Sequence, residues 1–474
     1  MSRPMDVAGI VSRLQSAAAK MRAVLTLRAG ETSSAAGRSR ERYRRAAITS
    51  LTAVATKGIN IGASLITIPL TLRYLGAERN GMWLSMSSTV LMLASADLGI
   101  GLGLVNVIAD SIGRDDREEA RRAASSAFWM LAAIALLVLV GFAIAYPLVP
   151  WNRIFNVQSA TAIHESGPTL MVFFACFAVN LPVGVVYNIQ TGLQKGYVNN
   201  QWSLVGSLLS LSGLLLAIHL HAGLPVLILA ISGAPLLALM MNGVQLFFWG
   251  EPGLRPSLRY LSLPTARRLL RTGLLFFVLG LCLAVAYQSD NFVITRIMGA
   301  RAVNGYALPA RLFNIVASLL VLLSGSMWPA YADAKARSDA QWIRRSFVRT
   351  VKLGTGLSAV ITLVLMVFGN RILALWVGPE IRASALLLAV FGVRCVLNAY
   401  LQPINLLLNG LNELRSQTIL MVIMAAVNIT LSIWFVRLFG VVGAVLGTVV
   451  AEAVVLVVPM TVVVNRTLKR LETA

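Results

Sequence analysis

Long apolar stretches separated by short polar connections fill almost the whole chain from residue 46 onward. A helix of roughly 20 apolar residues crosses a hydrocarbon core of roughly 30 Å, and these stretches are about twice as long as a barrel strand. Helices also satisfy their own backbone hydrogen bonds in lipid. The pattern therefore predicts an all-α integral membrane protein with twelve transmembrane helices. The twelve segments cover residues 46–72, 82–107, 124–150, 167–192, 203–220, 224–248, 270–296, 302–330, 352–378, 383–410, 417–438 and 440–464.

A short motif recurs after about 220 residues and indicates an internal duplication. Residues 73–81 read RYLGAERNG and residues 296–305 read RIMGARAVNG. A second pair, residues 190–194 and 408–412, ends the fourth and tenth segments; a chance match of small-residue turns is the alternative. Six helices per half is an even number, so the repeat predicts two six-helix lobes related by a pseudo-two-fold axis along the membrane normal.

The segments divide the chain into five regions. A basic N-terminal tail (1–45) precedes an N-terminal lobe (46–250), a linker (251–269), a C-terminal lobe (270–464) and a C-terminal tail (465–474). The first tail has ten Lys or Arg residues and lacks the apolar run of a cleavable signal peptide. It is compatible with a disordered tail, with a short interfacial helix or, by its Arg- and Ser-rich composition, with a transit peptide.

The distribution of basic residues predicts the orientation in the membrane. One set of alternate connections, with both tails, holds about thirty Lys or Arg, against about eight in the other set. Both termini and the linker are therefore expected to be cytoplasmic. A net charge of +22 would suggest nucleic acid in a soluble protein, but 57% of the residues are hydrophobic and no aromatic-basic platform is present, so no nucleic-acid partner is expected. The three cysteines indicate neither a disulfide framework nor a metal site.

Three cations lie inside predicted spans: Lys57, Arg311 and Arg394. A charge at the centre of a membrane helix costs about 2.5–3.5 kcal/mol on insertion scales, so each of them requires a cavity or a partner. The tenth segment adds a polar face, since successive polar residues fall within an arc of roughly 80°. This face includes Arg394, Asn398, Gln402, Asn405 and Asn409, and the fourth segment repeats it more weakly with Asn180, Tyr187, Asn188 and Thr191.

The N-terminal motifs resemble a known family. Asn60, Ile68-Pro69, residues 73–76 and 81–83, and the sequence ADLGIG at 96–101 are similar to the pattern of the Wzx-type polysaccharide and O-antigen flippases. These belong to the multidrug/oligosaccharidyl-lipid/polysaccharide exporter superfamily, and the resemblance covers residues 46–464. It implies a bacterial inner-membrane transporter that moves an undecaprenyl-diphosphate-linked oligosaccharide to the periplasmic leaflet by alternating access. Membrane lipid and other polysaccharide-assembly proteins are the partners it implies.

We therefore hypothesise a central cationic cavity in which Lys57, Arg311 and Arg394 bind the diphosphate. Five amides would contact the sugar: Asn60, Asn314, Asn398, Gln402 and Asn405. The alternative is that the three cations pair with acids inside the membrane or extend to an interface.

Three acids, Asp97, Asp290 and Glu452, also lie within predicted spans. Each is a candidate for coupling transport to a proton or sodium gradient, and a salt-bridge role, or a helix-end role for Asp97, is the alternative. No cofactor is expected, and no nucleotide-binding loop, catalytic triad or metal cluster is present in the sequence, so an enzyme is not expected. Two other functions stay open: a drug or cation antiporter of the same superfamily and, with less support, a membrane glycosyltransferase or ligase.

Overall fold

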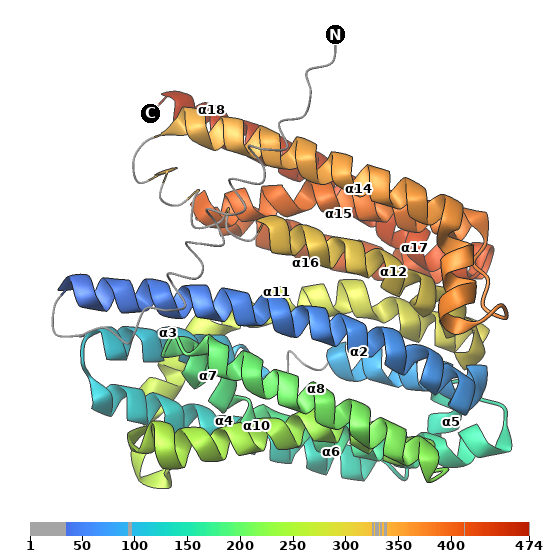
Figure 1. The fold of residues 1–474 in the computed structure, drawn as a ribbon, viewed down its shortest axis with the longest axis horizontal. Coiled ribbons are helices and arrows are strands. Elements are labelled where there is room, and N and C mark those ends of the chain that lie inside the picture. The colour runs from blue at the N-terminus through green and yellow to red at the C-terminus, as the bar shows by residue number, and fades with distance from the viewer. Residues whose placement is uncertain are drawn as a thin grey trace, which may run out of the picture.

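The chain folds into a bundle of long helices (Figure 1). The computed structural model describes residues 35–92, 97–324, 339–411 and 413–473, together with positions 327, 331, 334 and 335. No strand occurs within these ranges, so the all-α prediction is confirmed. The main helices are α2 Ala35–Met92, α3 Ile100–Gly113, α4 Arg117–Ala145, α5 Trp151–Ile154, α6 Ala160–Val183, α7 Val185–Gly192, α8 Gly196–His219, α9 Leu224–Ile228, α10 Ala234–Val244, α11 Leu263–Met298, α12 Ala300–Ser324, α14 Ala340–Val377, α15 Ala385–Leu411, α16 Leu414–Phe439, α17 Val441–Ala451 and α18 Val458–Thr473.

The helices pack as two groups that lie side by side (Figure 1). In the first group α2 packs on α8, α8 on α10, α3 on α4 and α4 on α6. In the second group α14 packs on α15, α16 on α17 and α11 on α16. Helices α11 and α12 also contact α2, and α11 contacts α3 and α4. These two helices therefore join the groups, because each packs against helices of both groups.

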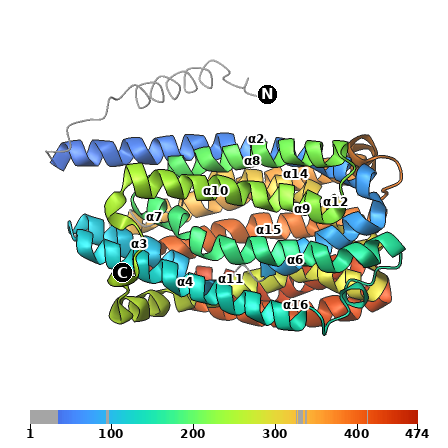
Figure 2. The ribbon, with the colours of Figure 1, turned by 90° about the horizontal axis from the view of Figure 1, so that it is seen from below.

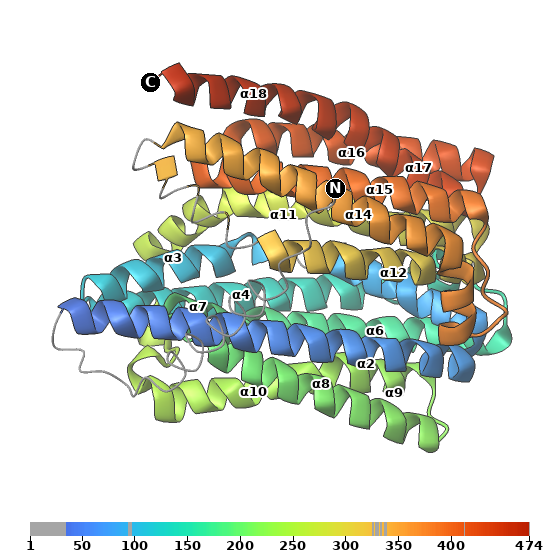
Figure 3. The same cartoon turned by 45° about the horizontal axis from the view of Figure 1, so that its top comes forward.

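The two ends of the bundle differ in what they contain. Figures 2 and 3 show the start of α2 and the end of α18 at the same end, which we call the terminal end. The opposite end, which we call the motif end, contains Gly76 and Gly299 of the repeated motif. Both glycines have positive φ angles, 74° and 93°, which only glycine adopts at no steric cost. The chain reverses direction at these single residues and is helical on both sides.

Several of the observed helices differ from the predicted segments. The predicted segment 82–107 is interrupted: the described helix stops at Met92 and resumes at Ile100, after Leu98 and Gly99 with φ of 52° and 72°. A helix cannot continue through two residues with left-handed backbone. Helix α11 begins at Leu263, inside the predicted linker, and α2 begins at Ala35, inside the predicted tail. The rest of that tail, residues 1–34 with the predicted interfacial helix, lies outside the described residues.

The apolar surface of the helices matches a membrane environment. Among the described residues, nine helical stretches are long and apolar enough to cross a membrane. Large apolar side chains such as Leu137, Val360 and Leu375 are more than 60% exposed, which lipid would cover. The chain is therefore a multi-pass membrane protein.

Candidate functional site

A cavity of about 570 Å³ lies between α2 of the first group and α11, α12, α14 and α15 of the second. We call it the arginine cavity because Arg311 and Arg394 line it, whereas no lining residue that the structure describes is acidic. Its volume is in the range of ligand-binding pockets, roughly 300–1,000 Å³. The polar residues that line it are Ser64, Ser87, Ser88, Tyr287, Gln288, Asn291, Tyr306, Arg311, Asn314, Ser318, Arg394 and Asn398.

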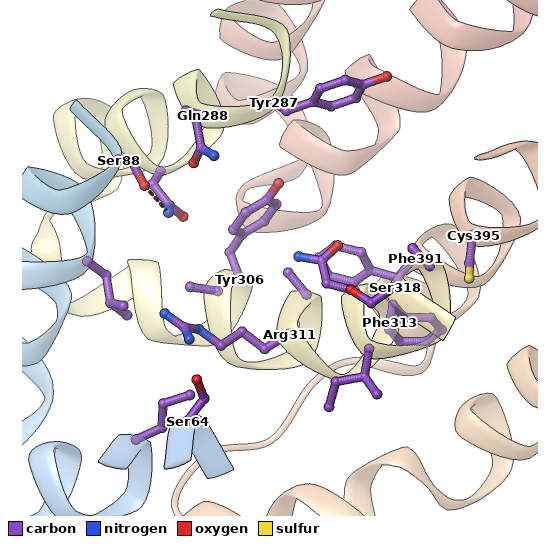
Figure 4. A pocket seen from close by; sticks show the side chains of 18 of the residues that line it. Ser64, Ser88, Tyr287, Gln288, Tyr306, Arg311, Phe313, Ser318, Phe391 and Cys395 are labelled. Carbon is purple, nitrogen blue, oxygen red and sulfur yellow. Dashed lines mark hydrogen bonds between the residues drawn. The ribbon is translucent and has the colours of Figure 1, made fainter. Parts of the chain in front are cut away.

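Arg311 projects into this cavity from α12. Figure 4 shows its side chain directed toward Ser64 of α2, across from Tyr306. Within the part of the chain that the structure describes, Arg311 has no ion pair and no hydrogen bond. A guanidinium stays charged in proteins and has five N–H donors. Arg311 therefore offers the cavity a positive charge whose donors are unused.

Arg394 lines the cavity from α15 but is partly neutralised. Its Nε atom lies 3.8 Å from Oε1 of Glu452, and its side chain is 15% exposed whereas that of Glu452 is fully buried. The Tyr287 ring lies over the guanidinium at 5.3 Å, and Asn398 donates to Glu452 at 3.4 Å. Glu452 begins a π-helical segment, Glu452–Val457, a feature often found at functional sites. Arg394 therefore both lines the cavity and lies near an acid.

Asp290 lies behind the cavity wall, 1% exposed, and is reached from the cavity through Tyr306. The Tyr306 hydroxyl donates to Asp290 at 2.6 Å, and the hydroxyls of Ser432 and Thr448 donate to it at 3.2 Å each. Asn428 donates to Thr448 at 2.9 Å. These partners were not predicted from the sequence. The spacing of four residues between Asn428 and Ser432, and between Thr448 and Glu452, could have shown two polar helix faces in apolar segments.

The remaining predicted residues do not line the arginine cavity. Lys57 is exposed on α2, nearer the terminal end than Ser64. Asn60 accepts a hydrogen bond from Ser207 at 2.6 Å, and Asn405 accepts one from Gln417 at 3.1 Å. Gln402 lines a different pocket, with Trp342 and Arg349.

Asp97 lies at the start of α3. Its carboxylate accepts the backbone N–H groups of Gly99 at 2.9 Å and Gly101 at 3.4 Å. This is the helix-end arrangement that was the predicted alternative for this acid. Asp97 does not line the arginine cavity.

A second cavity, of about 560 Å³, lies within the first group of helices. It shares Ser87 and Leu91 of α2 with the arginine cavity. We call it the neutral cavity, because none of its lining residues that the structure describes is charged. Five aromatic residues and three amides line it, together with serines and aliphatic residues. They are Trp83, Phe173, Phe177, Tyr187 and Trp202, with Asn180, Asn199 and Asn242.

Comparison with known proteins identifies the family of the chain. The model of the family "Polysaccharide biosynthesis protein" matches residues 47–335, more than half of the chain, and the MatE model matches residues 277–436. A "Putative O-antigen transporter" of Salmonella typhimurium is 20% identical over 84% of this chain and 91% of its own length. The "Uncharacterized membrane protein EpsK" of Bacillus subtilis is 20% identical over 79% of this chain and 74% of its own.

Solved structures share the fold at low sequence identity. A multidrug resistance MATE family transporter in an inward-facing conformation superposes with a TM-score of 0.76 at 16% identity, covering 87% of this chain and 96% of that one. An outward-facing conformation of such a transporter gives a TM-score of 0.65 over 91% and 97%. The chain therefore belongs to the polysaccharide biosynthesis protein family, as the resemblance to Wzx-type transporters of the multidrug/oligosaccharidyl-lipid/polysaccharide exporter superfamily predicts.

Proposed function

We propose that this membrane transporter is a flippase for an undecaprenyl-diphosphate-linked oligosaccharide and moves it from the cytoplasmic to the periplasmic leaflet for polysaccharide biosynthesis. The observation on which this rests is the arginine cavity, which has two arginines and no acidic lining residue among those described. A diphosphate carries several negative oxygens close together, and the planar fork of a guanidinium bonds two of them at once. A transporter for cationic drugs would need the opposite polarity.

The two arginines have different parts in this proposal. Arg311, without a partner in the described structure, is the primary contact for the diphosphate. Arg394 is shared, because its guanidinium lies near Glu452 and also borders the cavity. Lys57, on the same face of α2 as Ser64, would meet the diphosphate only before or after it occupies this cavity. Asn314 and Asn398 are the predicted sugar contacts that line it.

The topology follows the proposed function. We take the chain as twelve spans in two lobes of six, residues 46–250 and 270–464, related by a pseudo-two-fold axis along the membrane normal. The terminal end is cytoplasmic in an inner membrane, which the excess of Lys and Arg at that end supports. The higher TM-score to the inward-facing transporter agrees with a state closed at the motif end.

We further propose that Asp290 and Glu452 couple transport to a proton or sodium gradient. Each is buried, and each contacts a residue of the cavity wall: Tyr306 for Asp290, and Arg394 and Asn398 for Glu452. A substrate that draws Arg394 toward its diphosphate would leave Glu452 without its cation, and a buried carboxylate then favours binding a proton or a metal cation. Asp97 has no such link to the cavity among the residues that the structure describes.

The decisive experiment uses cells that make a surface polysaccharide and lack this protein. Arg311→Ala should abolish export and leave lipid-linked oligosaccharide on the cytoplasmic side, at protein levels equal to wild type. Arg301→Ala is the matched control, since it removes the same charge from an exposed position on α12 outside the cavity. Normal export by Arg311→Ala, or extrusion of cationic drugs in place of polysaccharide export, would contradict the proposal.

Coupling is tested separately in proteoliposomes. Transport of the extracted lipid-linked oligosaccharide should fall when the proton gradient is collapsed or when sodium is replaced by potassium. Undiminished transport under both conditions would exclude both ions.

A further inference from the structure

The lining of the neutral cavity has groups that do not serve to bind a diphosphate. No lining residue that the structure describes is charged there, while aromatic rings contribute much of the wall. The indole of Trp202 is held by a hydrogen bond of 2.7 Å from its Nε1 to Gln245, and the side chain of Trp83 is 8% exposed. These rings are fixed apolar surfaces, each large enough to cover one face of a small cyclic molecule.

Some polar groups of this cavity are already bonded within the protein. Gln190 donates to Asn242 at 2.7 Å and Asn242 donates back at 3.1 Å. Asn199 donates to the backbone oxygen of Tyr187 at 3.0 Å. This network joins α7, α8 and α10 and keeps the shape of the cavity.

Other polar groups of the cavity are unused. Among the described residues, the Asn180 amide and the hydroxyls of Tyr187 and Ser232 have no hydrogen-bond partner, although all three side chains line the cavity. An amide and a hydroxyl can each donate and accept. Sugar hydroxyl groups also donate and accept, whereas a polyprenyl chain does neither. A lipid tail in this cavity would leave these groups without partners.

The two cavities adjoin at one face of α2. Ser87 and Leu91 line both, so a ligand in the arginine cavity lies next to the neutral cavity. In a lipid-linked oligosaccharide the saccharide is joined directly to the diphosphate. We propose that the neutral cavity is the saccharide subsite, in which the aromatic rings stack on sugar C–H faces while Asn180, Tyr187 and Ser232 bond sugar hydroxyls. This inference rests on the proposed flippase function and adds the place where the saccharide binds beyond the sugar at Asn314 and Asn398.

The test compares two lipids by native mass spectrometry of the full chain in detergent. The first lipid is the lipid-linked oligosaccharide extracted from producing cells that lack the protein, and the second is undecaprenyl diphosphate without sugar. The double variant Asn180→Leu/Tyr187→Phe removes an amide and a hydroxyl while keeping similar volume. It should bind the first lipid about ten- to a hundredfold more weakly than wild type and bind the second unchanged. Unchanged binding of the second lipid also shows that the variant is folded.

Two further variants separate this inference from the proposed function. Gln201→Ala changes an exposed residue beside Trp202 that does not line the cavity, and it should bind both lipids as wild type does. Arg311→Ala should lose both lipids. If wild type binds the two lipids equally, or if the double variant retains full affinity for the first, the subsite is overturned and the flippase function stands. If wild type binds neither lipid, both proposals fail.

Discussion

Asn80 and Asn304, the matching asparagines of the repeated motif, meet each other at the motif end: Asn80 donates its side-chain amide to Asn304 at 2.6 Å. Asn80 belongs to α2 in the first group and Asn304 to α12 in the second. Both are 1% exposed. The duplication therefore supplies both sides of one contact, which holds the two groups of helices together. In the proposed transport cycle this contact must open for release at the motif end.

The glycine that follows each asparagine allows a direct comparison of the two copies. A Cβ atom on Gly81 would lie 1.8 Å from the backbone oxygen of Ala300, whereas one on Gly305 would have nothing within 4 Å. We expect Gly81→Ala to prevent this closed contact, to cost at least about 1–3 kcal/mol and to lower export, because a backbone atom cannot move aside as a side chain can.

The matched control for this prediction is Gly305→Ala, which makes the same change in the second copy. It should leave thermal stability and export near wild type. Equal behaviour of the two variants, in thermal unfolding in detergent and in polysaccharide export, would contradict a close approach at Gly81.

The Arg394–Glu452 pair predicts a stability effect distinct from the effect on transport. Arg394→Leu leaves the fully buried Glu452 without its cation, and breaking a buried pair costs about 3–5 kcal/mol. The double variant Arg394→Leu/Glu452→Leu should recover most of that loss, since no charge is then buried alone. Export should stay low in both, because Arg394 also borders the arginine cavity.

A double-mutant cycle of thermal unfolding measures this coupling. Strictly additive losses from the two single substitutions would show that the 3.8 Å approach contributes nothing to stability. Full export by the double variant would show that Arg394 does not contact the substrate.

The sequence predicted which helix faces are polar better than it predicted how deep in the bundle each residue lies. Lys57 and Ser64 share a face of α2, yet seven residues separate them by about 10 Å along the helix, and only Ser64 lines the cavity. The same holds for Arg394 and Gln402 on α15. Helical periodicity gives the direction of a side chain, but the depth of a cavity depends on how several helices pack, which no single segment encodes.

Hydrogen bonds between residues of different helices could not be predicted from the sequence either. The turns at Gly76 and Gly299 could be predicted because positive φ is a local property of glycine, and the spans because length and hydropathy are local too. The meeting of Asp290 with Ser432 and Thr448 joins residues more than 140 positions apart, and only the packed bundle reveals it.

At the motif end, Arg79 and Glu165 form a two-pronged ion pair that the sequence did not reveal. Arg79 donates from Nε at 2.6 Å and from a terminal nitrogen at 2.7 Å, and Glu165 also accepts the backbone N–H of Leu224 at 3.1 Å. Glu165→Ala should destabilise the protein by about 3–5 kcal/mol, because Arg79 would be left partly buried without its anion. Thermal unfolding of Glu165→Ala measures this loss of stability, and Glu380→Ala, which changes an exposed acid, is the control. Equal melting temperatures of the two variants would contradict the prediction.

At the terminal end, Glu251 predicts a pH-dependent contribution to stability. Its carboxylate lies 2.9 Å from Lys195 and 3.0 Å from Arg117, beyond the end of the helical stretch Leu224–Gly250. Burial raises the pKa of Glu251, but Lys195 and Arg117 lower it more, so the net pKa is below the usual 4.5. The stabilisation is therefore fully present above pH 4.5 and is lost as the pH falls through the lowered pKa.

Glu251→Gln should lower the free energy of unfolding by about 1–3 kcal/mol at pH 7. This difference from wild type should shrink only below about pH 4.5. Thermal unfolding in detergent between pH 7 and pH 4 measures this difference. Glu118→Gln is the control: Glu118 pairs with Arg122 but is 65% exposed, so its substitution should change little at any pH. If Glu251→Gln lowers the thermal stability equally at pH 4 and pH 7, the charge of Glu251 is not what stabilises this part of the terminal end.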